Sequence, residues 1–530
     1  MPLARGRGRR SDTPEGRQSE PSIGATRRSG RSVSGLLLRM VLALLVCLTI
    51  PLPGAAAIES PASELEIPWI SLADGIEFAT FYLPGPNRVY VARMEIHNPA
   101  VTLESMVAAG DRLGRRETVG RMARRYEQSL SAWGGTWGMR RDVVVAINGS
   151  FYGPSTGIPY GPQAHTGWFS FWSTSGGGLL TFGWTLDRQV LVSECLATPA
   201  SQQRIVFGET GTQMPLSGVD IPLPTQGVVL YSPDYMRLVP AVPGSVQVLA
   251  EVNRPVMLGA DGAQTFAAIR EIVTEPRDLR LAFGQIALVA HGESAARLLE
   301  NASVGATVGI GLELRDLGPG CLDPVGNPWD AVYAGLGSGV FFLVDSQYRP
   351  RTDGTEAVRH PRTAVCFNQD YFHFLVVDGR RARWSIGMTL AEMADFCEAT
   401  LGTTTGINLD GGGSSAMWVD GQILNQPSDG QERAVPDGLM MVSLESSQRS
   451  FRFAVGETVE VTAEVDLRLG PGADFGSVGV VTAGSRGEIE HPLSGLEGIF
   501  ASGTYWWPVT LEQGMGWLPE PALTSAEEAP

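Results

Sequence analysis

The sequence predicts a mixed α/β or α+β fold: a catalytic domain with a mixed β-sheet and flanking helices, followed by a small all-β barrel. Strand-like alternation and helical spacing both occur between residues 58 and 447. After residue 451 only short strand-like runs and turns occur. At 530 residues the chain is too long for one compact core, so about two to four domains are expected.

The first 57 residues differ in composition from the rest. An Arg-, Ser- and Gly-rich stretch leads into the apolar run MVLALLVCLTI at 40–50, which is shorter than the roughly 20 residues of a membrane span. Ala55-Ala56-Ala57 follows as an A-x-A cleavage pattern. We therefore expect a secretory signal cleaved near Ala57 and a secreted or cell-envelope location. The alternative is an uncleaved leader that anchors the chain to the membrane.

Removal of this leader makes the chain strongly acidic. The whole chain carries a net charge of −16, and the leader contributes +6 through nine Arg and three acids, which leaves −22. Such a chain repels a phosphate backbone, so no nucleic-acid partner is expected. The sequence contains no Lys, which excludes a Schiff-base lysine and a Walker-type phosphate lysine.

Residues 58–140 are expected to lead into, or to begin, a catalytic domain that covers 141–447. Paired strands are predicted around the Pro-Gly turn within 79–97, and helical spacing predicts a helix within 116–133. The run DVVVAIN predicts a strand that ends on Asn148. Residues 153–275 are predicted only to be β-rich, and 281–314 has the pattern strand, helix, strand.

The segment 359–424 has the clearest local signals. Two strands are predicted across the Asn-Gln-Asp turn at 368–370. Thr389 and Glu392 form a capping box at the start of a helix that ends at Gly402. The strand INLD follows and ends on Asp410, before three consecutive glycines and a hairpin with an Asp-Gly turn.

Three segments carry polar residues at the start or end of a predicted strand. They are Asn148 in AINGSF, His360 and Arg362 in RHPRT, and Asp410 in NLDGGGSS. Strand ends that meet at one sheet edge are common ligand sites. A Gly-Gly-Gly-Ser-Ser loop can direct several backbone N–H groups at one anion. Arg362 and Arg433 are predicted to complete a phosphate clamp.

These motifs resemble the phosphodiester glycosidase family. The residues that carry the resemblance are NLDGGGSS, NQPSDGQERAV, RHPRTAV, VVDGR and AINGSFY, and they occur in the family's order over about 85–443. Cys366 and Phe367 depart from the pattern, because smaller residues are expected after RTA. The resemblance implies hydrolysis of the sugar C1–O bond of an N-acetylglucosamine-1-phosphodiester-like substrate, with an envelope or extracellular polysaccharide as its source.

The resemblance and the local chemistry together assign roles to named residues. Asp410 is the first choice as the catalytic carboxylate, Glu432 is the second, and Asn148 is expected to orient the substrate or a water. Donors to the departing phosphate reduce the need for a strong general acid. The residues expected to bind the substrate or its phosphate are His360, Arg362, Gly411, Gly412, Gly413, Ser414, Ser415, Ser428, Asp429 and Arg433.

Other interpretations of the same residues stay open. The glycines could let a loop pass beneath a neighbouring strand, and Arg359, Arg362 and Glu432 could form a surface ion-pair network. No cofactor is expected, although Asp410 could ligate a divalent cation beside a phosphate. A metal-dependent phosphodiesterase and a non-catalytic glycan-binding protein are the rival functions. A serine esterase is disfavoured, because IPYGP rather than a helix follows the GPSTG motif at 153–157.

Residues 451–522 resemble the bacterial SH3-like domain, and 523–530 form a tail. The resemblance rests on DLRLGPGADFGSVGVV and YWWPVTLEQGMGWL, and it implies attachment to a cell-wall polymer. The four cysteines outside the leader permit disulfides in an exported protein, with three connectivities that the sequence does not rank. None lies in a C-x-x-C pair, so a zinc site is not expected. These cysteines are Cys195, Cys321, Cys366 and Cys397.

Overall fold

A computed structural model describes residues 67–526 with internal gaps, and the predicted signal and cleavage site lie outside the described residues. The gaps are 111–113, 130–139, 162, 166–167, 171–180, 198–202, 234–237, 254–264, 317–327, 338, 351–356, 446–447, 474 and 502.

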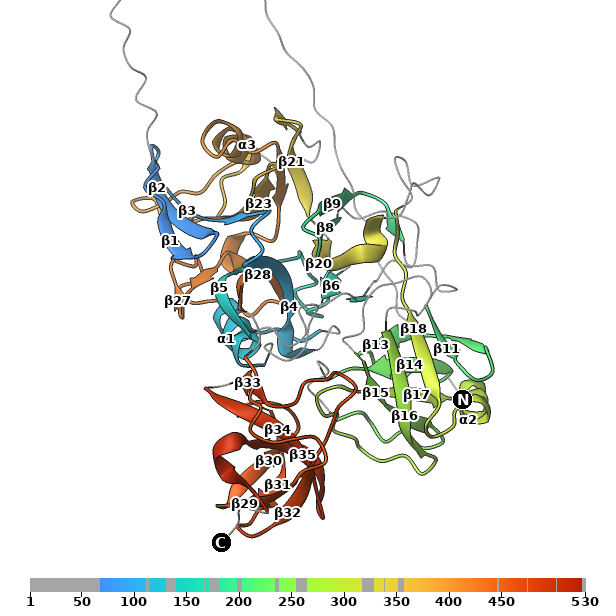
Figure 1. Cartoon of the computed structure of the whole chain (residues 1–530). Coiled ribbons are helices and arrows are strands. Elements are labelled where there is room, and N and C mark those ends of the chain that lie inside the picture. Colours follow the sequence, from blue (N-terminus) through green and yellow to red (C-terminus); the bar gives the residue numbers. More distant parts are fainter. Residues whose placement is uncertain are drawn as a thin grey trace, which may run out of the picture. The chain divides into compact units, whose positions relative to one another are not determined.

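The chain is mostly β-structure, and this finding corrects the predicted fold class. The described residues form six sheets and only three α-helices. Figure 1 labels these helices α1, α2 and α3. The prediction of a mixed α/β or α+β fold is therefore wrong. The physical reason is that sheets pack against sheets, so helices cover only the outer faces.

The first sheet contains the strands that lead to the site. All of its strand pairs are antiparallel, in the order β1-β2-β3-β24-β23-β25-β21-β22. The bounds are β1 Ile70–Ala73, β2 Ile76–Leu83, β3 Asn87–Glu95, β21 Val340–Val344, β22 Gln347–Tyr348, β23 Arg362–Phe367, β24 Tyr371–Val377 and β25 Thr405–Asn408.

A second antiparallel sheet packs on the first and supplies the other strands of the site. Its order is β27-β26-β5-β28-β4, with β4 Val101–Val107, β5 Arg140–Asn148, β26 Met417–Val419, β27 Gln422–Ile423 and β28 Asp437–Glu445. The apolar side chains between the two sheets form one buried cluster, which includes Phe374, Val376, Ile147 and Leu439. This sandwich core brings the end of β5 beside the start of β23.

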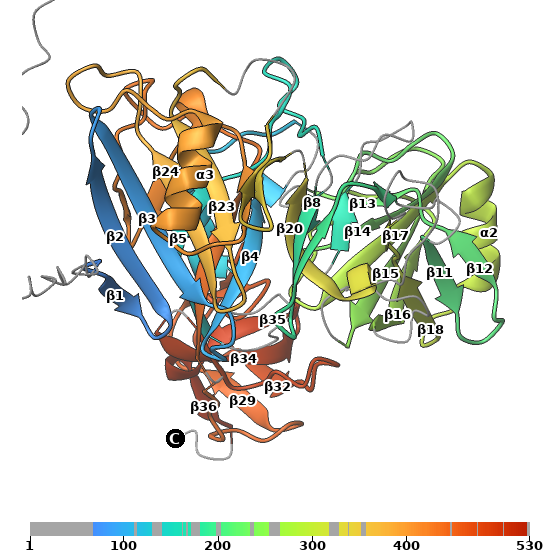
Figure 2. The same ribbon diagram turned by 90° about the horizontal axis from the view of Figure 1, so that it is seen from above.

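One helix covers the outer face of each of these sheets. Helix α3, Leu390–Ala399, buries Leu390, Met393 and Cys397 against β3, β23 and β24 (Figure 2). The predicted capping box of Thr389 and Glu392 is present. Helix α1, Val119–Ser129, packs its apolar side on β5 and β28.

The β-rich region between Gln163 and Gly337 builds three further sheets. A five-stranded sheet contains β6 Gln163–His165, β7 Trp168–Ser170, β8 Thr181–Thr185, β9 Val190–Ser193 and β20 Val332–Gly337. A two-stranded sheet pairs β10 Leu196–Ala197 with β19 Arg315–Asp316. An eight-stranded sheet contains β11 Arg204–Phe207, β12 Gln213–Pro215, β13 Gly218–Val219, β14 Gly227–Tyr231, β15 Val246–Val252, β16 Thr265–Val273, β17 Gln285–His291 and β18 Thr307–Gly311. Helix α2, Glu293–Asn301, lies between β17 and β18, as the sequence predicts.

The C-terminal segment is all-β and has its own apolar interior. It also shares a core with the sheet formed by β11–β18. In this core the rings of Phe283 and Trp517 meet edge to face, with centroids 5.7 Å apart. The Phe283 N–H donates to the Leu469 carbonyl at 2.8 Å. Its strands are β29 Thr458–Val461, β30 Val465–Arg468, β31 Ser477–Val481, β32 Arg486–Ile489, β33 Ile499–Ala501, β34 Thr504–Leu511, β35 Gly514–Pro519 and β36 Leu523–Ser525.

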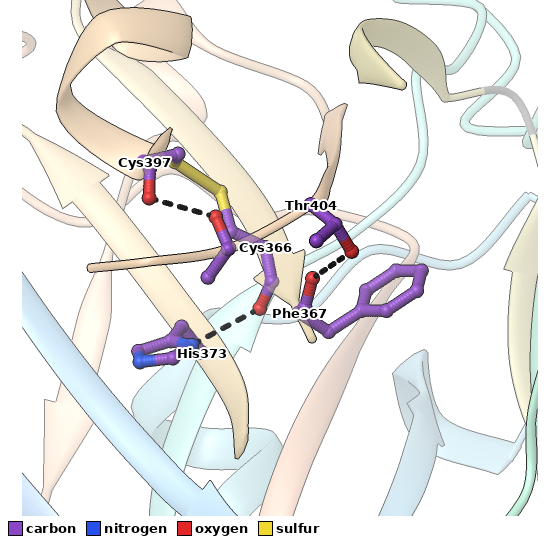
Figure 3. The surroundings of a disulfide bond; sticks show 6 residues. Cys366, Phe367, His373, Cys397 and Thr404 are labelled. Atoms are coloured by element: carbon purple, nitrogen blue, oxygen red, sulfur yellow. Dashed lines mark hydrogen bonds between the residues drawn. A yellow bond between two sulfur atoms is a disulfide. The ribbon is translucent and has the colours of Figure 1, made fainter. Parts of the chain in front are cut away.

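A disulfide between Cys366 and Cys397 ties β23 to helix α3 (Figure 3). The Cα atoms are 6.5 Å apart, a separation within the usual range for disulfides. This pairing gives a structural role to Cys366, which departs from the sequence pattern expected after RTA. Cys195 is also disulfide-bonded. No helix in the described part of the chain is both long enough and apolar enough to span a membrane.

Candidate active site

The glycine triplet follows β25 and joins the two packed sheets. The Asp410 N–H donates to the Gly149 carbonyl at 3.0 Å, and the Gly412 N–H donates to the Pro361 carbonyl at 2.9 Å. A Cβ atom on Gly411 would lie 2.7 Å from that same Pro361 oxygen, which is too close for any side chain. Gly411 is therefore required for a close contact between two backbones. This agrees with the alternative interpretation, in which the glycines let a loop pass beneath a neighbouring strand.

The other two glycines make room for charged side chains. Gly412 has φ +65°, and a Cβ there would lie 3.0 Å from a guanidinium nitrogen of Arg380. A Cβ on Gly413 would collide with the Asp429 carboxylate and with Arg433. The triplet thus lets two arginines approach the turn Gly412–Ser414.

Asp410 precedes this turn, with Gly411 between them, and has an unusual environment. Its side chain is partly buried, it is hydrogen-bonded to Ser414, and it feels the positive charge of Arg433. Burial raises the pKa of Asp410 to about 6, although the hydrogen bond and the arginine oppose the shift. A carboxyl with such a pKa is ionised at neutral pH and still basic enough to accept a proton.

Asn148 is fully buried at the end of β5, and its amide hydrogen-bonds to protein groups. Its Nδ2 donates to the Asp410 carbonyl at 2.7 Å. Its Oδ1 accepts from Thr363 Oγ1 at 2.8 Å and from the Ala416 N–H at 3.1 Å. Asn148 therefore fixes the backbone on both sides of the glycine turn.

The two arginines predicted as a phosphate clamp differ in their surroundings. Arg362 is buried, and its guanidinium donates to the carbonyls of Met388 at 3.0 Å and Val358 at 2.9 Å. Burial lowers the pKa of Arg362 to about 10. Arg433 is half exposed and pairs with Asp429 at 2.6 Å. Its Nη1 donates to Ser414 Oγ at 3.3 Å, so Arg433 is beside Asp410 whereas Arg362 anchors the loop that precedes β23.

Other predicted site residues surround the same turn. Burial, with the charges of Arg362 and Arg380, lowers the pKa of His360, and its buried Nδ1 has no hydrogen-bond partner in the described structure. The buried Ser415 hydroxyl is likewise unpartnered within the described residues. Ser428 Oγ accepts a long contact of 3.5 Å from Arg380.

Glu432 and Arg359 have partners of their own. Glu432 Oε2 accepts from the Gly120 N–H at 2.8 Å, in the first turn of helix α1. Arg359 forms an ion pair with Glu392 of the capping box, so the described residues do not form the alternative network of Arg359, Arg362 and Glu432. The structure therefore brings Asp410, Arg433, Asp429, Ser414 and Ser428 together and places Glu432 against a helix terminus.

Three charged residues of this region are absent from the sequence-based site. Arg380 has φ +62°, a left-handed conformation that is uncommon outside glycine. Asp437 is fully buried, and burial together with the charge of Asp410 raises its pKa to about 6. Asp378 is buried and accepts hydrogen bonds from Tyr90, Trp384, Asn425 and the Gln426 N–H.

Sequence signals for these three residues are weak but present. Arg380 and Asp378 lie in VVDGR, and Asp437 follows the ERAV motif. Each is a single charged residue without a characteristic spacing. Within the described ranges no group of three or more His, Cys, Asp or Glu side chains is arranged to hold a metal ion.

Residues 288–442 match the family model of phosphodiester glycosidases. This range contains Asp410, Arg433, Arg380 and Asp437, but not Asn148, and it starts well after residue 85, where the resemblance begins. The match supports a glycosidase-type hydrolase activity. The SH3-like identity of residues 451–522 remains a prediction.

Similar proteins were found among curated sequences and solved structures. The SPbeta prophage-derived uncharacterized protein YomE of Bacillus subtilis is 37% identical over 135 residues, which is 25% of this chain and 21% of YomE. The chain thus matches about a fifth of the length of that relative.

Three solved structures have TM-scores of 0.42, 0.42 and 0.34. The first is a hypothetical protein from Synechocystis, with 16% identity over 72% of this chain and 64% of that one. The second is described as an exported protein from Burkholderia pseudomallei K96243, with 19% identity over 67% and 74%. The third is the zebrafish N-acetylglucosamine-1-phosphodiester alpha-N-acetylglucosaminidase catalytic domain, auto-inhibited by its pro-peptide, with 14% identity over 69% and 81%.

Proposed function

We propose that this chain hydrolyses the sugar C1–O bond of a sugar-1-phosphodiester and that Asp410 is its catalytic carboxylate. The supporting observation is one juxtaposition. A partly buried carboxyl with a pKa of about 6 directly precedes a glycine turn that two guanidinium groups approach. The family match over 288–442 supports the same reaction class.

In this reaction the bond between the anomeric carbon and the bridging oxygen breaks. Asp410 either attacks the anomeric carbon, forming a glycosyl ester that water then hydrolyses, or takes a proton from the attacking water, and the phosphate monoester departs with the bonding electrons. Arg433 and Arg380 stabilise the charge on the departing phosphate, which reduces the need for a strong general acid. No metal ion or cofactor takes part in this proposal.

The remaining residues act through position. Asn148 and Thr363 fix the backbone around Asp410. Glu432 accepts a hydrogen bond from the Gly120 N–H in the first turn of helix α1, which holds the backbone next to Arg433 in place. Arg362 anchors the loop before β23 rather than binding the phosphate directly.

We further propose that the chain works outside the cytoplasm on an envelope or extracellular polysaccharide. The buried disulfide Cys366–Cys397 supports an oxidising compartment. The signal-like leader supports export, and attachment to a cell-wall polymer is proposed for the C-terminal segment.

The proposal is tested by incubating the purified chain with aryl and alkyl sugar-1-phosphodiesters and separating the products. Free reducing sugar together with a phosphate monoester is the expected result. Release of sugar-1-phosphate would instead identify a phosphodiesterase. Binding of the substrates without turnover would favour a glycan-binding protein.

A further inference from the structure

Three arginines contact consecutive residues of one partly exposed loop, Gln426–Asp429. Arg381 donates to Gln426 Oε1 at 2.5 Å and to the Pro427 carbonyl at 3.2 Å. Arg380 Nη1 contacts Ser428 Oγ, and Arg433 pairs with Asp429. The loop is four residues long, so the three guanidinium groups lie along at most about 11 Å of chain.

This row carries more positive charge than its acidic neighbours neutralise. Asp429 pairs with Arg433, whereas Arg380 and Arg381 have no salt bridge to any described acidic residue. Arg383 is exposed at the tip of the tight turn that joins Arg381 to Ser385. The cluster stands out because the chain without its leader carries a net charge of −22.

The backbone that carries the row is closely packed. A Cβ on Gly379 would lie 2.6 Å from the Pro361 nitrogen, so the residue before Arg380 has to be glycine. Arg380 then adopts its left-handed conformation. A strained conformation at a ligand site is a form of preorganisation, because the side chain is directed before the ligand arrives.

We infer that the Arg381 end of this row, with Arg383, forms a second phosphate subsite, and that the preferred substrate carries a second phosphate beyond the one bonded to the sugar. The inference rests on the proposed function, which assigns the first phosphate to Arg380 and Arg433. The second phosphate then lies toward Arg381, at the Gln426 end of the loop, and toward the adjoining turn that carries Arg383. One phosphodiester bears a single negative charge and needs fewer cations than the row provides.

Direct binding tests the subsite without any requirement for turnover. Inorganic tripolyphosphate and orthophosphate are titrated into the full chain by calorimetry at a fixed ionic strength. Tripolyphosphate is expected to bind at least about tenfold more tightly, an effect of the size of one charged hydrogen bond. Equal affinities for the two anions would overturn the inference.

Matched variants show whether the preference arises from this loop. Arg383→Gln, and separately Arg381→Gln, should reduce the preference for tripolyphosphate about tenfold. Arg297→Gln removes the same charge from an exposed position on helix α2 and should retain the preference. An equal loss in Arg297→Gln and Arg383→Gln would show a general charge effect and would also overturn the inference.

Kinetics identify the source of the second phosphate. Three substrates are compared: a sugar-1-phosphodiester with one phosphate, a nucleoside diphosphate sugar, and a sugar-1-phosphodiester whose second phosphate lies one sugar farther along. Arg383→Gln should lower the ratio of kcat/KM for one of the two-phosphate substrates to that for the one-phosphate substrate. If the nucleoside diphosphate sugar is affected, the second phosphate belongs to a diphosphate. If the other substrate is affected, it belongs to the next unit of a repeating sugar phosphate.

The two proposals fail in different ways. If tripolyphosphate binds as expected but no substrate releases free sugar, the glycosidase proposal is wrong and the subsite stands. If free sugar is released while every ratio is the same in wild type and Arg383→Gln, the subsite is wrong and the glycosidase proposal stands.

Discussion

Replacing Asp410 with Asn removes one negative charge from the site and keeps the size of the side chain. If Asp410 is the catalytic carboxylate, kcat should fall by about 10²-fold or more, as expected for the loss of an acid–base or nucleophilic group. The wild-type kcat/KM should itself fall about tenfold per pH unit below pH 6, because burial raises the pKa of Asp410 to about 6.

The same pKa predicts an effect on stability with the opposite sign. The native pKa of about 6 lies above the ordinary value of 3.8, so the native state binds this proton more tightly than the unfolded state. The resulting stabilisation is complete below about pH 4 and is lost as pH rises through 6. The difference amounts to at most about 3 kcal/mol. Asp410→Asn should therefore be as stable as the wild type at pH 4 and more stable above pH 6.

The assay combines chemical denaturation at pH 4 and pH 7 with initial rates on an aryl sugar-1-phosphodiester. Asp395→Asn is a matched control, because Asp395 is exposed on helix α3, and both rate and stability should stay near wild type. A folded Asp410→Asn variant that keeps most of its rate would refute the catalytic assignment. An Asp410→Asn variant with a lower free energy of unfolding than the wild type at pH 7 would refute the argument that burial destabilises the ionised form of Asp410.

Three further predictions concern the arginines, the glycines and the C-terminal segment. Arg362→Ala should lower the free energy of unfolding by about 1–3 kcal/mol, because it leaves buried carbonyls unpaired; Arg380→Ala should leave the melting temperature unchanged and lower kcat/KM at least about tenfold. Gly413→Ala should impair activity because its Cβ would displace the Asp429–Arg433 pair, whereas Gly479→Ala, which has open space around it, should not. Truncation after residue 447 should lower the melting temperature by exposing the Phe283 core, and unchanged melting would contradict the shared packing.

Local structure near the site could be predicted from the sequence because turn and cap chemistry acts over a few residues. The capping box of Thr389 and Glu392, the turn at 368–370 and the Asp-Gly hairpin are all present. Asp410 follows a strand that comes after a helix, as predicted, but the strand ends at Asn408 rather than on Asp410.

The fold class could not be predicted because strand pairing in this chain is non-local. Strand β26 pairs with β5, which lies more than two hundred residues earlier, and β20 pairs with β6 and β8. Short apolar runs such as those in 153–275 do not identify such partners. The division of the strands into several sheets therefore cannot be predicted from the sequence.

The site was predicted only where residues formed a motif. The glycine triplet, Asp410 and Arg433 stand in runs with a recognisable pattern, and the structure brings them together. Arg380 contributes through its backbone conformation and its contact with Gly412, neither of which is visible in the sequence. Arg362 has the expected charge, but its burial directs the guanidinium to backbone carbonyls.

The central claim is that the bond broken lies between the sugar carbon and the oxygen, and hydrolysis in ¹⁸O-labelled water tests it most directly. The products of a sugar-1-phosphodiester are separated and their masses are measured. Our account predicts that the label enters the hydroxyl on the anomeric carbon and that the phosphate monoester stays unlabelled. Label in the phosphate, with an unlabelled sugar, would mean attack at phosphorus and would contradict the account.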